Sequence, residues 1–188
     1  MKKHIKISLK SIAIVGSIAM LFSCANSTKE VRDFLAAKNL PIGEAKNAYH
    51  VYKDSGRITS KLITPLMLDF SNRKSHPYSE FPNGIKIINF ENKGKDSVTI
   101  TGNYALSYSK TLVSEIEGNV VVINHTEKSR LETEQLFWDQ NSQYFFTEKA
   151  FLLTTLKDTI KGVGFESKED LSKHLEKNIT GTLQTQEE

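Results

Sequence analysis

The chain has 188 residues, which is enough for one domain with its own hydrophobic core. Its formal net charge is +3, but four of its lysines lie in the first ten residues. Without this N-terminal leader the chain carries 21 basic and 22 acidic residues. Such a near-neutral domain is not expected to bind nucleic acid, because neutralising phosphates requires a basic surface. The chain has one cysteine, which excludes an intramolecular disulfide.

Residues 1–23 have the pattern of a secretory signal peptide. A lysine-rich start is followed by an apolar run of 11 residues, Ile12 to Phe22. A membrane-spanning helix needs about 20 apolar residues, so this run is too short to span a bilayer. The run ends in Leu-Phe-Ser before Cys24, which resembles a bacterial lipobox. We therefore expect Cys24 to become an acylated N-terminus that anchors the chain to a membrane. The alternative is an ordinary cleaved signal peptide with an unused cysteine.

Residues 24–48 are interpreted as the lipid anchor and a tether. Ser27 and Glu30 have the spacing of a helix capping box, and Val31, Phe34 and Leu35 fall on one helical face. One short helix is therefore predicted, ending before Pro41.

From residue 49 onward, apolar and polar residues alternate with the period of a β-strand. Val98 and Ile100, and then Val120 and Val122, show this alternation. Polar hairpin tips occur at 54–56, 92–96, 125–128 and 157–158. The pattern predicts an all-β antiparallel domain over residues 49–183, followed by a tail at 184–188. Residues 71–83 are interpreted as a connecting loop, and 167–177 as either a short helix or an edge strand.

The sequence offers no recognisable catalytic or cofactor motif. No histidine has a second histidine or a cysteine at metal-ligand spacing, and phosphate-binding glycine loops and nucleophile elbows are missing. The acidic pairs, Glu115 with Glu117 and Glu132 with Glu134, lie two residues apart and are interpreted as solvated strand faces. We therefore predict no enzymatic activity, no cofactor and no metal.

Several motifs resemble one family. They are Asn39-Leu40-Pro41, Asp54-Ser55-Gly56-Arg57, Phe81-Pro82-Asn83-Gly84-Ile85, Glu117-Gly118-Asn119-Val120-Val121, Gly162-Val163-Gly164-Phe165-Glu166 and the run Leu131 to Asp139. Together they look like the lipopolysaccharide-export protein LptC in its Bacteroidetes form, over about residues 28–183.

The resemblance implies a single open, twisted antiparallel β-jellyroll around a hydrophobic groove. It also implies a non-catalytic role: receiving lipopolysaccharide from an LptB2FG-type ABC transporter and passing it to an LptA-like periplasmic protein. Proteobacterial members hold the membrane with a transmembrane helix, whereas this chain is expected to use the lipid on Cys24. A periplasmic, lipid-anchored location follows, at the inner membrane in our prediction, although a lipobox could also direct the protein to the outer membrane.

One face of each strand is predicted to line the acyl-chain groove, and ordinary core packing is the competing explanation for each position. The candidate groove residues are Leu62, Ile87, Ile100, Leu106, Ile116, Val120, Val122, Phe137, Phe145 and Leu153.

The two ends of the fold are predicted to dock partners, because exposed strand edges pair with other chains. The N-terminal edge, near 49–52 and 58–62, is expected to face the transporter. The C-terminal edge, represented by Ile160, Gly162, Gly164 and Phe165, is expected to meet the LptA-like protein.

Two other interpretations stay open. A lipoprotein carrier would also have a lipid-binding β-structure, but it would need helices that plug an incomplete barrel. A structural envelope lipoprotein would share the β-domain without binding lipopolysaccharide.

Overall fold

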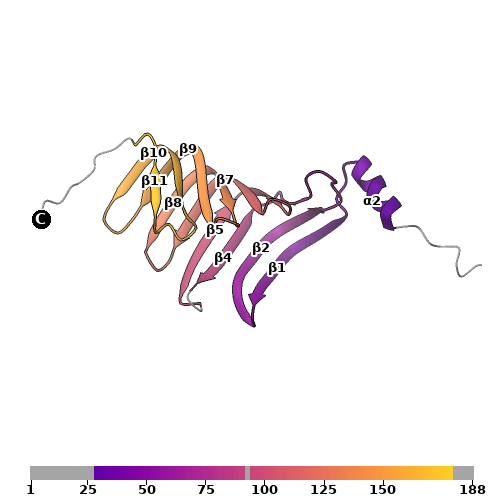
Figure 1. Cartoon of the computed structure of the whole chain (residues 1–188), viewed down its shortest axis with the longest axis horizontal. Coiled ribbons are helices and arrows are strands. Elements are labelled where there is room, and N and C mark those ends of the chain that lie inside the picture. Colours follow the sequence, from indigo (N-terminus) through magenta and orange to yellow (C-terminus); the bar gives the residue numbers. More distant parts are fainter. Residues whose placement is uncertain (1–27, 92–93, 180–188) are drawn as a thin grey trace, which may run out of the picture.

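A computed structural model describes residues 28–91 and 94–179 of the chain. The predicted signal peptide, Cys24 and the predicted tail at 184–188 lie outside these residues. One helix, α2 (Thr28–Ala37), precedes the strands and confirms the predicted short helix. It lies at one end of the long axis of the molecule, and the sheet extends away from it (Figure 1).

Eleven strands of the described residues form one continuous antiparallel sheet. They are β1 (Gly43–Asp54), β2 (Arg57–Phe70), β3 (Tyr78–Phe81), β4 (Ile85–Glu91), β5 (Asp96–Gly102), β6 (Tyr104–Tyr108), β7 (Val113–Asn124), β8 (Ser129–Asp139), β9 (Tyr144–Thr154), β10 (Thr159–Lys168) and β11 (His174–Glu176). The fold is the expected antiparallel β-jellyroll.

The jellyroll arises because β2 and β7 are joined twice. One half of each strand is bridged by β4 and β5, and the other half by β3 and β6. The sheet therefore divides into two facing layers, which we call the upper layer (through β4 and β5) and the lower layer (through β3 and β6). From β7 the strand order continues through β8, β9 and β10 to β11, whereas β1 flanks β2 at the other end.

Threonines mark the corner where long strands pass from one layer to the other. The Thr64 hydroxyl donates to the carbonyls of Gly84 and Leu66 at 2.8 and 2.9 Å. Thr133 donates to the Ala150 carbonyl at 2.9 Å, and the Lys149 amide donates to Thr147 at 3.0 Å. These hydroxyls satisfy backbone groups that a bent strand leaves without ladder partners. The register shifts in β7, β8 and β10 fall at the same corner.

The core of the upper layer is one apolar row that crosses seven strands. Consecutive members of the row are cross-strand partners: Leu62, Ile87, Ile100, Val122, Leu131, Leu153 and Ile160. The four central residues, Ile100 to Leu153, have no exposed surface, whereas Leu62 and Ile160 at the two ends are half-buried. The alternation in the sequence therefore describes a real interior face, closed in its middle and accessible at its ends.

Two predicted boundaries differ from the structure, and the edge-strand alternative for a third segment is confirmed. The β-domain begins with β1 at Gly43, and not at residue 49, because Gly43 to Ala48 pair with the distal half of β2. Residues 71–83 are not entirely a loop, since Tyr78–Phe81 form β3 between β2 and β6. Finally, the ambiguous segment 167–177 contains no helix: it turns and returns as β11 beside β10.

Candidate lipid-binding groove

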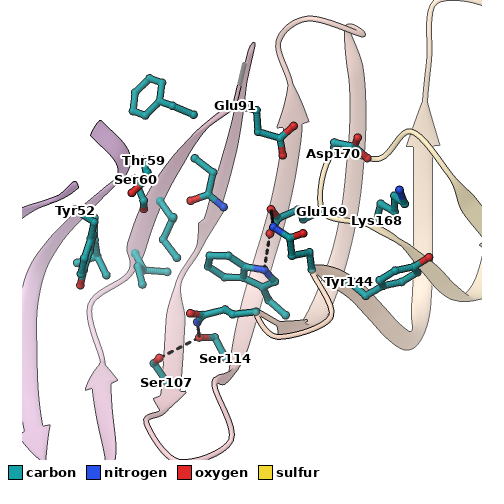
Figure 2. Close-up of a pocket in the computed structure, with 18 of the residues that line it drawn as sticks. Tyr52, Thr59, Ser60, Glu91, Ser107, Ser114, Tyr144, Lys168, Glu169 and Asp170 are labelled. Atoms are coloured by element: carbon teal, nitrogen blue, oxygen red, sulfur yellow. Dashed lines mark hydrogen bonds between the residues drawn. The ribbon is translucent and has the colours of Figure 1, made fainter. Parts of the chain in front are cut away.

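A groove of about 830 Å³ opens between the two layers at the β2–β4 end of the apolar row (Figure 2). This size lies within the usual range of small-molecule sites. One wall comes from β1, β2, β4 and the end of β3, and the other from β6, β7, β8, the β8–β9 turn, the start of β9 and the end of β10 with the segment after it. Because both layers contribute to its walls, the groove is the mouth of the jellyroll interior.

The upper wall of the groove carries an apolar patch, beside polar residues such as Ser60 and Asn89. Leu62 and Ile87, the first two members of the apolar row, lie side by side on it. Phe81 and Ile85, at the turn between β3 and β4, extend this surface. Phe81, Ile85 and Ile87 are nearly inaccessible to water, so this wall continues directly into the hydrophobic core.

The lower wall is polar and internally hydrogen-bonded. The Gln140 amide donates to Ser114 Oγ at 3.1 Å, and Ser114 Oγ donates to Ser107 Oγ at 3.1 Å. Trp138 Nε1 donates to Glu169 Oε2 at 3.1 Å, and Figure 2 shows these bonds side by side. The groove is therefore amphipathic: an apolar patch on one wall faces hydroxyl and amide groups on the other.

Acidic side chains gather at one end of the groove. Burial raises the pKa of Glu169, the nearby charges of Glu91 and Asp170 raise it further, and only the Trp138 hydrogen bond opposes these effects. The pKa of Glu91 is also raised, first by burial and then by Asp170 and Asp96. Among the described lining residues, Lys168 is the one cation. This end of the groove therefore carries negative potential.

The structure divides the ten predicted groove residues into three groups. Leu62 and Ile87 line the groove. Six more are core residues with no more than 1% of their surface exposed: Ile100, Ile116, Val120, Val122, Phe145 and Leu153. In this conformation these six residues pack in the core and do not line the groove. They lie deeper in the interior that the groove enters.

The remaining two, Leu106 and Phe137, lie on the opposite face of the sheet, so their predicted interior placement is wrong. Leu106 follows buried Ala105 and pairs with Glu115. Phe137 lies between buried Leu136 and Trp138 and stacks on Phe146, with ring centroids 5.0 Å apart. The bulge after Thr133 reverses the side-chain alternation of β8, so Trp138 faces the groove in place of Phe137.

The predicted C-terminal partner edge is also covered. β11 pairs with Phe165 to Ser167 of β10, and Ile179 bridges to Gly162. The Lys177 amide donates to the Gly164 carbonyl at 2.8 Å, and the Lys177 ammonium contacts Glu166 at 2.6 Å and Glu148 at 3.2 Å. Gly162 and Gly164 do allow a second backbone to approach closely, as predicted. That backbone belongs to residues 177–179 of the same chain and not to a partner protein. β10 is therefore an interior strand along most of its length, and Ile160 lies at the end of the apolar row.

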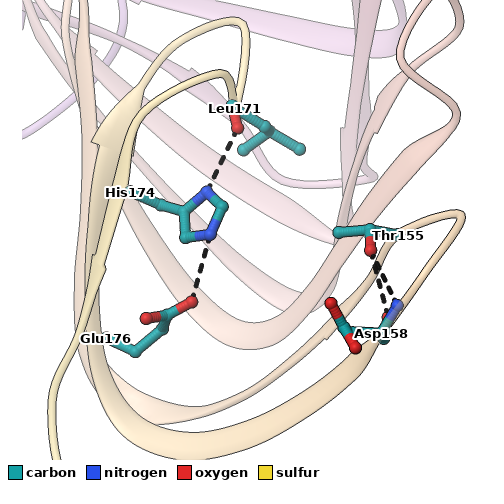
Figure 3. A network of polar contacts seen from close by, with 5 residues as sticks. All are labelled: Thr155, Asp158, Leu171, His174 and Glu176. Carbon is teal, nitrogen blue, oxygen red and sulfur yellow. Dashed lines mark hydrogen bonds and ion pairs between the residues drawn. The ribbon is translucent and has the colours of Figure 1, made fainter. Parts of the chain in front are cut away.

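The turn that leads into β11 is held by local polar contacts (Figure 3). His174 Nδ1 lies 3.3 Å from the Leu171 carbonyl, and Nε2 lies 3.1 Å from Glu176 Oε1. Nearby, Thr155 and Asp158 close the β9–β10 hairpin through backbone and hydroxyl bonds. These contacts make the C-terminal end of the sheet an ordered structure.

The family described as "LptC: Lipopolysaccharide-assembly, LptC-related" matches residues 15–184, nearly the whole chain. The chain belongs to this LptC-related family. A search of curated proteins finds no match to the chain. The family match confirms the family resemblance of the sequence motifs. The LptC-related family takes part in lipopolysaccharide transport as a non-catalytic component that faces the periplasm.

No helix among residues 28–91 and 94–179 is long and apolar enough to cross a membrane. In the same part of the chain, no group of three or more His, Cys, Asp or Glu side chains is placed to hold a metal ion.

The sequence predicted only Leu62 and Ile87 among the residues that line the groove. Trp138, Phe81 and Ile85 were not among the candidates, although all three are buried aromatic or branched residues at strand ends. The polar lower wall was missed entirely, because Ser107, Ser114 and Gln140 have no sequence signature. The motif Phe-Pro-Asn-Gly-Ile at 81–85 was the one available signal, since its turn places Phe81 and Ile85 on the upper wall.

Proposed function

We propose that this protein is a non-catalytic relay that shelters the acyl chains of lipopolysaccharide in the groove between its two layers. The observation that carries the proposal is the amphipathic groove: an apolar wall at Leu62 and Ile87 that continues into the core, facing a hydroxyl- and amide-lined wall. Exposing an acyl chain to water costs about 0.8 kcal/mol for each methylene. A sheltered apolar path therefore removes the main barrier to moving such a lipid through the periplasm.

The charges of the groove orient the lipid within it. Phosphate groups would be repelled by Glu91, Glu169 and Asp170, which the single Lys168 does not balance. We therefore propose that the acyl chains enter along Leu62 and Ile87 and that the phosphorylated headgroup stays outside the acidic end. The central apolar row would open only when a ligand separates the layers, because Ile100 and Val122 have no exposed surface.

The open ends of the sheet suggest how the relay connects to its neighbours. β1 pairs only with β2 among the described strands, and its distal half, including Tyr49 and Tyr52, is exposed. We propose that this end receives lipopolysaccharide from an LptB2FG-type transporter. At the other end, β11 is the last described strand, and we propose that an LptA-like protein docks there, beside β11.

Acylation of Cys24 would keep the relay at the inner membrane, next to the transporter. The lipobox-like sequence supports this, and the described residues supply no membrane-spanning helix. Mass spectrometry of the mature protein should find Cys24 diacylated or triacylated at the N-terminus. An unmodified N-terminus at another residue would exclude the lipid anchor.

Lipopolysaccharide binding to purified protein tests the groove. Leu62→Glu places a charge on the apolar part of the wall and should reduce binding by about tenfold or more, since a bound acyl chain would bury that unpaired charge. Ile63→Glu is the matched control, because Ile63 is exposed on the opposite face of the same strand. Equal binding by both variants, with native circular dichroism, would contradict the proposed groove.

A lipoprotein carrier is the second candidate that such a groove could serve. It would need helices that plug the barrel, but the described residues contain one helix, α2, and it lies away from the groove. Competition between lipopolysaccharide and an acylated peptide separates the two functions. Preferential binding of the peptide would favour the carrier.

A further inference from the structure

Helix α2 buries none of its ten residues. Val31 and Phe34 are 45% and 60% exposed, and Leu35 beside them is only half-buried. These three side chains share one face, whereas Asp33 lies on the opposite face of the helix. A helix of ten residues is marginal in water without a surface to pack against. Among the described residues, nothing buries this apolar face completely.

The position of α2 in the chain limits what can cover that face. Only three residues, 25–27, separate Cys24 from Thr28 at the start of the helix. A fully extended chain of this length spans no more than about 14 Å. If Cys24 carries acyl chains, as proposed above, the first turn of α2 must lie within that distance of the anchored residue, whatever path the chain takes.

Basic side chains surround the helix. Lys29 and Arg32 lie on it and Lys38 follows it directly, against Glu30 and Asp33. The loop after β2 adds Arg73, whose guanidinium donates to Asn39 Oδ1 at 2.8 Å, and Lys74, which lies 4.0 Å from Asp33. Basic side chains therefore outnumber acidic ones on the helix and in the loop beside it, which suits anionic lipid headgroups.

The loop after β2 also fixes the helix to the β-domain. Asn72 donates to the Arg32 carbonyl at 3.4 Å, and Arg73 contacts both Asn39 and the Leu40 carbonyl. The orientation of α2 is therefore transmitted to β1, which begins at Gly43. A surface that binds α2 also sets the direction in which the edge of β1 points.

We propose that α2 is an interfacial helix, which lies on the bilayer with Val31, Phe34 and Leu35 inserted among the lipid headgroups. The proposal rests on the lipid anchor at Cys24, and it adds a second contact that orients the domain. A lipid chain alone leaves the attached domain free to rotate, whereas an anchor plus an inserted helix holds the β1 end of the sheet toward the membrane. The groove mouth is then presented at a fixed angle to a transporter in the same membrane.

The test uses the full acylated chain in vesicles of phosphatidylethanolamine and phosphatidylglycerol. Because Cys24 is the only cysteine and acylation consumes it, Phe34→Cys or Asp33→Cys provides a single thiol for an environment-sensitive fluorophore. We expect blue-shifted emission at position 34, with quenching by lipid-borne nitroxides at least about twofold stronger than at position 33. Neither substitution threatens the fold, since neither side chain is buried.

Three results would overturn the proposal. Water-like emission at both positions, with acylated Cys24 shown by mass spectrometry, would exclude the interfacial helix and leave the anchor intact. Shielding at position 34 without lipid quenching would mean that protein, such as a second copy of the chain, covers the face. A mature chain without acylated Cys24 would remove the anchor and the helix proposal together, independently of lipopolysaccharide binding in the groove.

Discussion

Trp138 Nε1 donates a hydrogen bond to Glu169 Oε2 at 3.1 Å, and this bond links β8 to the segment after β10 at the mouth of the groove. The bond joins β8 to the turn that precedes β11. The lower wall of the groove is therefore built in part by two residues, Trp138 and Glu169, that lie 31 positions apart in the sequence. Gln143 donates to the other Glu169 oxygen at 3.3 Å. Glu169 therefore holds the acidic end of the groove in place.

Glu169 should make the stability of the protein depend on pH. Its pKa is raised in the folded protein above the ordinary value of 4.5, first by burial. The folded state then binds more protons than the unfolded state between these two pKa values, so stability falls as pH rises through that window. Glu169→Gln should remove this part of the fall. Urea unfolding between pH 4 and pH 8 measures it, and an unchanged pH profile would contradict the assignment. Because the charges of Glu91 and Glu169 interact, the change in the profile also includes the response of Glu91.

Shortening a side chain at the end of the apolar row should reduce the free energy of unfolding less than the same change at its centre. Ile100 has no exposed surface, so Ile100→Ala should lower the free energy of unfolding by about 2–5 kcal/mol. Leu62 is half-buried at the groove, and Leu62→Ala should cost less, about 1 kcal/mol. Chemical denaturation measures both. Equal losses would mean that Leu62 is packed as tightly as the core and that the groove is not open there.

The corner of the jellyroll should depend on its threonines. Thr64 is 1% exposed and its hydroxyl binds two carbonyls, so Thr64→Val should cost about 1–3 kcal/mol through the unsatisfied acceptors. Thr59→Val, on an exposed part of the same strand, is the control and should change stability by less than about 0.5 kcal/mol. If the two variants unfold at the same urea concentration, the corner bonds do not stabilise the fold.

Gly164 combines a backbone constraint with a close contact. Its φ is +85°, and a Cβ there would lie 3.0 Å from the Lys177 side chain, whereas Gly56 has φ +79° and nothing within 4 Å. Gly56→Ala should therefore cost only the left-handed backbone penalty, about 1–2 kcal/mol. Gly164→Ala should cost more and should speed amide exchange at Lys177, because β11 must shift. Equal costs, with unchanged exchange at Lys177, would show that the β10–β11 contact tolerates a side chain.

Much of the fold could be predicted from local patterns. Alternation located the interior residues Ile100, Val122 and Leu153, and the polar turns located the hairpins, because both signals act over a few neighbouring residues. Phe137 was misplaced because a bulge reverses the alternation within one strand, and the sequence around Thr133 gives no sign of it.

The site was harder to predict because it forms between distant segments. Its walls bring Leu62 opposite Ser114 and Glu169. Likewise, Gly162 and Gly164 correctly indicated a close backbone approach, but the identity of that backbone depends on a turn at residues 169–173 that returns the chain as β11. Periodicity carries no information on either pairing.

Photo-crosslinking in cells tests the central claim most directly. A photoreactive amino acid at Ile87 faces the groove, and one at Lys86 lies next to it on the exposed face of β4. We predict that Ile87 crosslinks to lipopolysaccharide and that Lys86 does not, while the transporter is active. Crosslinking at Lys86 with none at Ile87, in protein that accumulates normally, would contradict transport through the groove.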